Sequence, residues 1–275
     1  MVKKSTGLII GFFLLLAAGN SQTFLSKAEM EIKSSFDLLS ETGNDDDKYA
    51  INERIISRMQ NILMIKESFR YPFDSLFYVR KITSPDHNFR IYTWNLSLTN
   101  GTHKYFGFVQ QSLQSDDSLS LHFLDDQAEL FSLPDQPIYT NDKWYGAIYY
   151  QIIPVKIGKK RYYTLLGVDL NNLFTTRKLI DIFYMENNKV KFGFPVFSDG
   201  QNQVTRVVFE YSAQVSMTLN YSRSRKIIYF DHLAPSDPKF QGQYNHYGPD
   251  SSIDGFKFID DKWIYMPDLD INQIN

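Results

Sequence analysis

Two stretches near the N-terminus repeat apolar residues at intervals of three or four, which is the spacing of one helical face. An acidic segment, residues 41–47, lies between them and places its carboxylates at the start of the second stretch, where a helix dipole favours negative charge. The pattern predicts a helical hairpin over residues 22–70 that packs on the domain after it. The apolar positions are Phe24, Ala28, Ile32, Phe36 and Leu39 in the first stretch and Ile51, Ile55, Met59, Ile62 and Leu63 in the second.

From Phe77 onward the pattern changes to period two, the alternation of a half-buried β-strand. Asn100-Gly101 between two such runs is the strongest short hairpin signal in the chain. If these residues alone form the loop, Trp94 stands opposite Gly107, where the indole would shield bare backbone. The sequence therefore predicts a hairpin with its loop at this dipeptide.

Other segments between apolar runs extend this picture. Turns at Asn187-Asn188 and at Asp260-Asp261 would bring apolar residues opposite one another on the flanking strands. Val215 to Tyr221 alternates cleanly and predicts a strand with one buried face. Leu173 to Ile182 has instead the composition of a short helix, with Asn172 as its N-cap.

Strands at this spacing, joined by tight turns, predict a mainly β (α+β) protein. We expect an antiparallel meander that closes as a sandwich or as a barrel, preceded by the N-terminal helical hairpin. Residues 71–275 would then form a single antiparallel β-rich domain. The pattern does not choose between sandwich and barrel.

The longest stretch that resembles neither a strand nor a helix runs from Phe230 to Phe256. Irregular connections of this length are uncommon in compact domains and are usually functional or disordered. Its aromatic residues argue against disorder, because they can bury apolar surface. We therefore expect a rigid loop and predict that it binds a partner. The predicted binding residues are Phe240, Tyr244, His246 and Tyr247.

The same stretch holds the candidate catalytic groups, which are Asp231, His232, Asp250 and Asp254. Carboxylates and imidazoles together suit acid–base hydrolysis or a zinc or calcium site. Their spacing matches no named metal motif. Aspartates in such turns also bond to nearby backbone, and this interpretation is the favoured one. We predict no metal and no cofactor, and keep a metal-stabilised structural protein as an alternative.

The first residues have the pattern of a secretory signal peptide: two lysines, an apolar run from Leu8 to Ala18, and then small and polar residues. The apolar run is shorter than the roughly 20 residues that span a bilayer. We predict that residues 1–21 are a signal peptide, cleaved after Ser21 or alternatively after Gly19. No later stretch is apolar for long enough to cross a membrane, so we expect a soluble exported chain.

Composition narrows the possibilities further. The chain has no cysteine, which excludes disulfides, thiolate metal sites and lipid anchoring through cysteine. Removal of residues 1–21 takes away two lysines and no acid, so the net charge changes from −2 to −4. This mild balance gives no electrostatic case for nucleic acid. The aromatic share of 16% fits a sheet-rich core or exposed binding rings.

Four segments resemble those of exported proteins from Bacteroidetes-type bacteria that carry no assigned activity. They are FRIYTWN from Phe89, YYTLLGVDLNN from Tyr162, FDHLAP from Phe230 and YGPDSSIDGF from Tyr247. The resemblance implies the periplasm or the outer surface of a Gram-negative cell. It carries over no functional residue.

Two functional hypotheses follow, and neither fixes the ligand or the oligomeric state. The first is a non-enzymatic exported protein that binds an envelope or extracellular partner, a protein or a glycan, through residues 230–256. The alternative is a hydrolase of envelope or extracellular glycans, with Asp231 and His232, or Asp250 and Asp254, as acid and base. Two carboxyl groups about 5 to 9 Å apart in an open cleft would favour the hydrolase. Aspartates bonded within their own turns would favour the binding protein.

Overall fold

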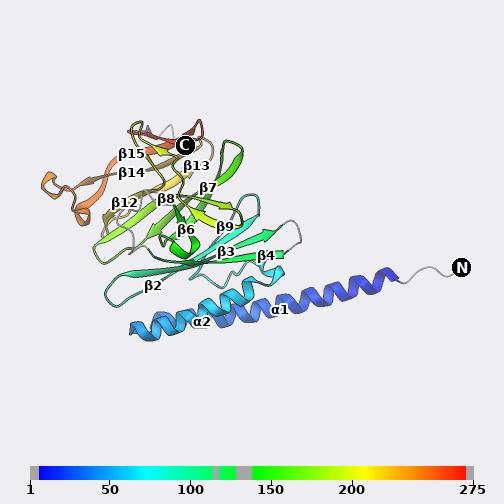
Figure 1. Cartoon of the computed structure of the whole chain (residues 1–275). Coiled ribbons are helices and arrows are strands. Elements are labelled where there is room, and N and C mark those ends of the chain that lie inside the picture. Colours follow the sequence, from blue (N-terminus) through cyan, green and yellow to red (C-terminus); the bar gives the residue numbers. More distant parts are fainter. Residues whose placement is uncertain (1–5, 114–117, 128–137, 271–275) are drawn as a thin grey trace. The chain divides into compact units, whose positions relative to one another are not determined.

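A computed structural model of the chain describes residues 6–113, 118–127 and 138–270, with side chains from residue 21 onward. The protein is mainly β, with 48% strand and 22% helix, and two N-terminal helices precede the antiparallel sheets (Figure 1). The predicted fold class is confirmed. Two compact units are present: Met1–Val79 with Gln110–Leu121, called here the helical unit, and Arg80–Val109 with His122–Asn275, called the β unit.

The helical unit contains α1 (Thr6–Glu41), α2 (Asp45–Leu63) and the 3-10 turn η1 (Lys66–Phe69). Periodicity predicts its buried face well, since residues such as Ile32, Ile55 and Met59 are fully buried. At the start of the first stretch, however, Phe24 is 56% exposed and Leu25 is buried instead. Within the described residues, no helix combines the length and the apolar content needed to cross a bilayer.

Polar contacts hold the elements of the helical unit in place. Asn44 caps α2, because its side chain accepts a hydrogen bond from the Asp47 backbone N–H at 2.8 Å, and acids occupy the first turn as the sequence predicts. Glu29 of α1 is 4% exposed. Its carboxylate accepts hydrogen bonds from the Tyr71 hydroxyl at 2.7 Å and the Ser75 backbone N–H at 2.6 Å, so this buried charge has partners.

The strands of the β unit form three sheets. Two strands of the first sheet, β3 and β4, continue into the helical unit. The first sheet has the order β1 (Arg80–Thr83), β2 (Phe89–Ser97), β3 (His103–Leu113), β4 (Ser118–Asp125). The second has the order β5 (Tyr139–Thr140), β9 (Lys189–Phe192), β8 (Thr175–Glu186), β7 (Lys160–Asp169), β6 (Ile148–Ile157), with β12 (Val207–Ser212) paired to β8. The third has the order β11 (Gln203–Val204), β10 (Phe197–Ser198), β16 (Lys262–Met266), β15 (Tyr247–Ile259), β14 (Ile227–Pro235), β13 (Leu219–Ser222).

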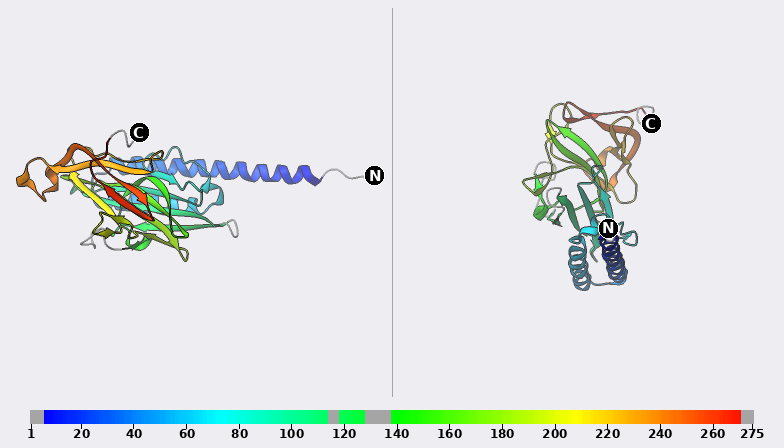
Figure 2. Two further views of the ribbon diagram at one scale, coloured as in Figure 1. Left: turned by 90° about the horizontal axis from the view of Figure 1, so that it is seen from above. Right: turned by 90° about the vertical axis from the view of Figure 1, so that its right-hand side faces the viewer.

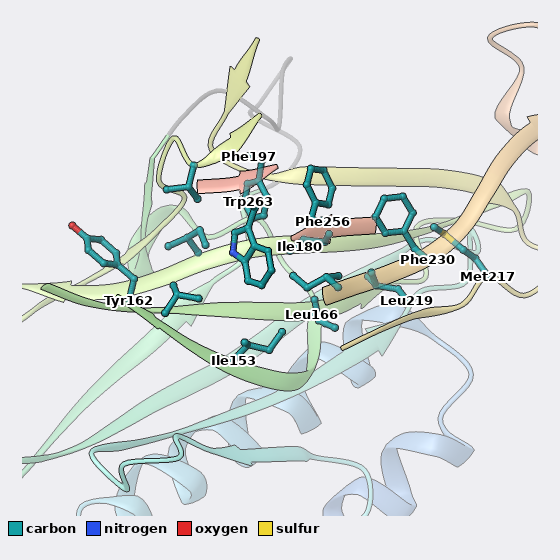
Figure 3. Packing of buried hydrophobic residues seen from close by; sticks show 14 of the residues in the cluster. Ile153, Tyr162, Leu166, Ile180, Phe197, Met217, Leu219, Phe230, Phe256 and Trp263 are labelled. Atoms are coloured by element: carbon teal, nitrogen blue, oxygen red, sulfur yellow. The ribbon is translucent and has the colours of Figure 1, made fainter. Parts of the chain in front are cut away.

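The sheets pack in a sandwich-like arrangement, and one of them curls into a half-barrel. Figure 3 shows side chains of the second and third sheets pointing toward one another, with Leu166 and Ile180 on one side and Phe230, Phe256 and Trp263 on the other. This close packing of large apolar side chains is the main source of stability in such a core.

The opposite face of the second sheet is buried as well. A separate apolar cluster joins it to residues of β2 and β3. Phe89 of β2 lies edge-on to Tyr163 at 4.7 Å between ring centroids and tilted against Phe183 at 4.6 Å. The second sheet is therefore covered on both faces.

This double burial explains one wrong prediction. The segment expected to be a helix, Leu173 to Ile182, lies mostly in β8, because a strand covered on both faces is apolar on both sides and lacks alternation. Asn172 does accept hydrogen bonds as a cap would, from the N–H groups of Phe174 at 2.8 Å and Thr175 at 3.1 Å. The turn that it closes leads into a strand.

The predicted loop length of the first hairpin is also wrong, because the loop contains three residues and not two. Leu98 accepts a hydrogen bond from the Gly101 N–H at 3.0 Å, and Gly101 has φ of 82°, the conformation of a bulge that adds a residue to the loop. The register of β2 against β3 moves accordingly. Trp94 stacks near Phe106, at 6.0 Å between ring centroids, rather than over Gly107.

The other two predicted hairpins are confirmed. Asn187 and Asn188 have φ of 51° and 58°, and Asp260 and Asp261 have φ of 47° and 65°. Positive φ at both loop positions is the requirement of a type I′ turn, and the strands pair directly on either side. The predicted strand from Val215 is correct only from Leu219 onward.

Candidate functional site

The region predicted as a long irregular loop is a β-hairpin. β14 and β15 pair from Ile227 with Lys257 to Pro235 with Tyr247, and only residues 236–246 lie outside the two strands. The sequence conceals this, because prolines and aspartate turn signals lie inside the strands. In Figures 1 and 2 the end of the hairpin, in orange, projects beyond the other strands of its unit. We call residues 236–247 the tip.

Short-range contacts hold the tip in one conformation. The rings of Phe240 and His246 stack with centroids 3.9 Å apart and planes at 13°. The Tyr247 hydroxyl accepts a hydrogen bond from the Gly242 N–H at 3.0 Å. Tyr244 packs against Tyr247 at 5.1 Å between centroids and remains 46% exposed. The four residues predicted to bind a partner therefore lie together.

Part-way along the hairpin, two of the candidate catalytic residues meet. His232 Nδ1 lies 2.7 Å from Asp254 Oδ2, and the Tyr265 hydroxyl donates to the same oxygen at 2.5 Å. The Asp268 N–H donates to Asp254 Oδ1 at 3.1 Å. Asp254 is only 2% exposed, and each of its two carboxylate oxygens has a hydrogen-bond partner within the protein.

The strand register places these two side chains together. Phe230 is the direct partner of Asp254, and His232 follows two residues after Phe230, so the imidazole and the carboxylate are diagonal neighbours on one face of the hairpin. The register then shifts, because Leu233 pairs with Pro249, and residues 250–252 bulge opposite His232.

The environment perturbs both partners of the carboxylate. The hydrogen bond to Asp254 raises the pKa of His232, whose side chain is 44% exposed. Burial, and then the hydrogen bond to Asp254, raise the pKa of the Tyr265 hydroxyl. The imidazole thus has a fixed orientation and keeps its proton to a higher pH than an ordinary histidine does, which suits a proton-dependent contact.

The other two candidate aspartates are engaged by backbone. Asp231 accepts a hydrogen bond from the Thr218 N–H at 2.6 Å. Asp250 accepts from the Ser252 N–H at 3.0 Å and from its hydroxyl at 2.7 Å, and these bonds lower the pKa of Asp250. The four candidates therefore do not converge as one group. Among the described residues, no three histidine or acidic side chains are arranged to hold a metal ion.

Sequence reasoning missed a second polar cluster, around Arg177 of β8. Arg177 is the cross-strand neighbour of both Asp169 and Glu210. Its Nη1 lies 3.6 Å from Asp169 Oδ2, and its Nε lies 2.8 Å from Glu210 Oε2. Burial raises the pKa of Asp169. Opposite charges on facing strands would have been the signal, but it was hidden by the assignment of this segment to a helix.

No protein-family model, curated protein or solved structure matches this chain. Function is therefore argued from the geometry of the tip and of the cluster around Asp254.

Proposed function

We propose that this protein is an exported, non-enzymatic binding protein whose tip contacts an envelope or extracellular partner. One observation carries the proposal: Phe240 stacked on His246 holds a projecting segment in one conformation while Tyr244 stays exposed. A side chain that is already ordered loses little conformational entropy on binding, which favours recognition. The signal peptide predicted over residues 1–21 supports export.

The state of the aspartates supports binding over catalysis. Asp250 bonds within its own turn and Asp231 bonds the backbone next to β13, so neither is held as one of a pair of carboxyl groups across a cleft. Glycoside hydrolysis commonly uses such a pair. The bonded aspartates instead shape the hairpin that carries the tip.

The tip can be removed without disturbing the register of the hairpin. Pro235 and Tyr247 are direct strand partners, so Asn-Gly in place of residues 236–246 closes the hairpin with a short turn. We expect this variant to keep its circular dichroism spectrum and to stop sedimenting with envelope fractions of the producing cell. Ile259→Ser, at a position that is 42% exposed, is the matched control and should sediment normally. Equal sedimentation of the shortened variant would exclude the tip as the contact.

Export is tested separately. Intact-mass measurement of the protein recovered from outside the cytoplasm should show loss of residues 1–21, or of residues 1–19 if cleavage follows Gly19. Recovery of the full-length chain from the cytoplasm alone would contradict the proposed location.

A second candidate function is hydrolysis of envelope or extracellular glycans. One observation favours it: Asp254 holds the His232 imidazole by one ring nitrogen, as an orienting carboxylate holds a base. His232→Gln should then abolish release of reducing sugar from isolated envelope glycan while the protein stays folded. Release that is unchanged in the variant, or undetectable in the unaltered protein, rules this candidate out.

A further inference from the structure

Large apolar side chains are exposed on three loops of the β unit. Leu173 and Phe174, between β7 and β8, are 70% and 69% exposed. Val215, between β12 and β13, is 42% exposed, and Tyr244 of the tip is 46% exposed. Exposed apolar side chains that gather in one place mark interaction sites, whereas scattered ones need no explanation. We call these four residues the apolar ridge.

Contacts within the β unit show that the three loops are neighbours. The Ala213 N–H donates to the Phe174 carbonyl oxygen at 2.9 Å, which joins the first loop to the second. Val215 lies beside Gly248, where an added Cβ would be 3.5 Å from its Cγ2, and Gly248 directly follows the tip. The 3-10 turn of Tyr244 also lies near β12. The ridge is therefore continuous with the tip.

Two cations close to the ridge in the sequence are engaged by acids, and Asp250, two residues beyond Gly248, is bonded within its own turn. Arg177 is engaged by Asp169 and Glu210. Lys239 of the tip lies 3.3 Å from Asp237. The complement of such a surface is uncharged, because an approaching charge would find no free partner and would lose its hydration.

A sugar would cover the ridge less completely than an apolar protein face would. Phe174 and Tyr244 expose rings on which a sugar could stack, but Leu173 and Val215, the other half of the ridge, present no ring. In the tip, the ring of Phe240 is stacked on His246. A surface of anionic lipid is disfavoured too, because Arg177 and Lys239, two cations close to the ridge in the sequence, are already engaged by acids.

We propose that the apolar ridge docks an uncharged, apolar face of a partner protein, beside the contact made by the tip. This inference rests on the proposed function, since it names the class of partner. Leu173 and Phe174 are the anchors, because they have the most apolar surface to remove from water.

Site-specific photo-crosslinking in producing cells tests the proposal on the full chain. p-Benzoylphenylalanine replaces Phe174 in one variant, Tyr244 in a second and Ile259 in a control, and adducts are identified by mass spectrometry. We expect the same protein partner at positions 174 and 244 and none at 259. A protein adduct at 244 alone would overturn the ridge while leaving the tip proposal intact. Lipid or glycan adducts at 174, or an adduct with a second copy of this chain, would show that the partner class is wrong, and no adduct at either position would count against both proposals.

The partner identified in this way is then purified for a binding titration. Leu173→Ser combined with Phe174→Ser should weaken its binding by about tenfold or more, the effect of losing central apolar anchors. Affinity should stay nearly constant between about 0.1 M and 1 M salt, over which charge contacts are screened. Retained affinity in the double variant, or steep weakening with salt, would overturn the proposal. Measurable binding of the unaltered protein to phosphatidylcholine vesicles alone would do the same.

Discussion

Two ion pairs of the β unit illustrate opposite uses of charge. Asp181 and Arg206 are both fully buried, with Arg206 Nη2 2.9 Å from Asp181 Oδ2. His232 Nδ1 lies 2.7 Å from Asp254 Oδ2, but the side chain of the histidine is 44% exposed and the side chain of the aspartate, a residue that is 2% exposed as a whole, is 4% exposed. Neither side chain of the first pair reaches solvent, whereas the histidine of the second pair does. Burial, rather than the distance between the charges, therefore decides which pair responds to the pH of the solvent.

The buried pair of Asp181 and Arg206 has a structural role. The Tyr149 hydroxyl also reaches Asp181 Oδ2, at 3.4 Å, and the Arg206 guanidinium lies over the Tyr139 ring at 4.3 Å from its centroid. Although burial alone lowers the pKa of Arg206, attraction to Asp181 raises it, so the guanidinium stays charged. Arg206 directly precedes β12, and its bond to β8 helps to define where β12 pairs.

The largest effect is expected when the buried pair is broken. Arg206→Met leaves the Asp181 carboxylate buried without its partner and should lower the free energy of unfolding by about 3–5 kcal/mol, measured by urea denaturation. Asp181→Asn combined with Arg206→Met should recover part of this loss. If the double variant is less stable than the single one, the pair is not the source of the effect.

A smaller loss is expected at Asp254, within the hairpin. Asp254→Asn keeps the shape of the side chain but removes the charge that accepts bonds from His232, Tyr265 and the Asp268 N–H. Thermal unfolding should show a loss of about 1–3 kcal/mol, the range for a buried polar group left partly unsatisfied. Tyr265→Phe removes a single bond and should cost less. Equal losses in the two variants would mean that the carboxylate charge is unimportant.

The histidine itself should contribute less, and its contribution should depend on pH. Because the folded-state pKa of His232 is raised above the ordinary value of 6.5, its stabilising effect is complete below that pH and is lost as pH rises through the folded pKa. Unfolding of the unaltered protein and of His232→Gln should differ by less than about 1 kcal/mol just below pH 6.5, where the imidazole is charged, since solvent screens the pair. The difference should vanish once the pH exceeds the folded-state pKa of His232. A difference that grows with pH would have the wrong sign for this pair.

The smallest effect is expected at a third pair, Lys239 and Asp237 of the tip, whose side chains are 67% and 46% exposed. Lys239→Ala should change the free energy of unfolding by less than about 0.5 kcal/mol, because water replaces most of the interaction. The unfolding free energies of Lys239→Ala, His232→Gln and Asp254→Asn then compare three positions of increasing burial. A loss as large as that of Asp254→Asn would break the link between burial and stability.

The sequence predicted the elements whose information is local. Asn187-Asn188 and Asp260-Asp261 were recognised because a hairpin of this kind needs residues that tolerate positive φ, and their neighbours confirm the pairing. The start of α2 was recognised from its acids, which Asn44 accompanies as cap. These features depend on a few consecutive residues.

What the sequence hid depends on distant neighbours. β8 looked helical because the layers that cover both of its faces are far away in the chain. The contact between His232 and Asp254 depends on the pairing of β14 with β15, which the sequence did not reveal because this stretch resembled an irregular loop. Of the candidate site, the sequence therefore located the region and its aromatic residues, while the strands that carry them and the polar pair part-way along these strands came only from the three-dimensional arrangement.

The two strands that carry the tip have a further consequence for the behaviour of the protein at high concentration. Near the tip, Leu233 to Pro235 pair with Tyr247 to Pro249, and in the described sheets neither segment has a third strand beside it. Such open edges invite pairing with another molecule and hence aggregation. Pro235 and Pro249 lie in these segments and offer no N–H to an incoming strand. The same prolines that made the hairpin hard to recognise in the sequence thus disfavour edge-to-edge pairing between molecules at high concentration.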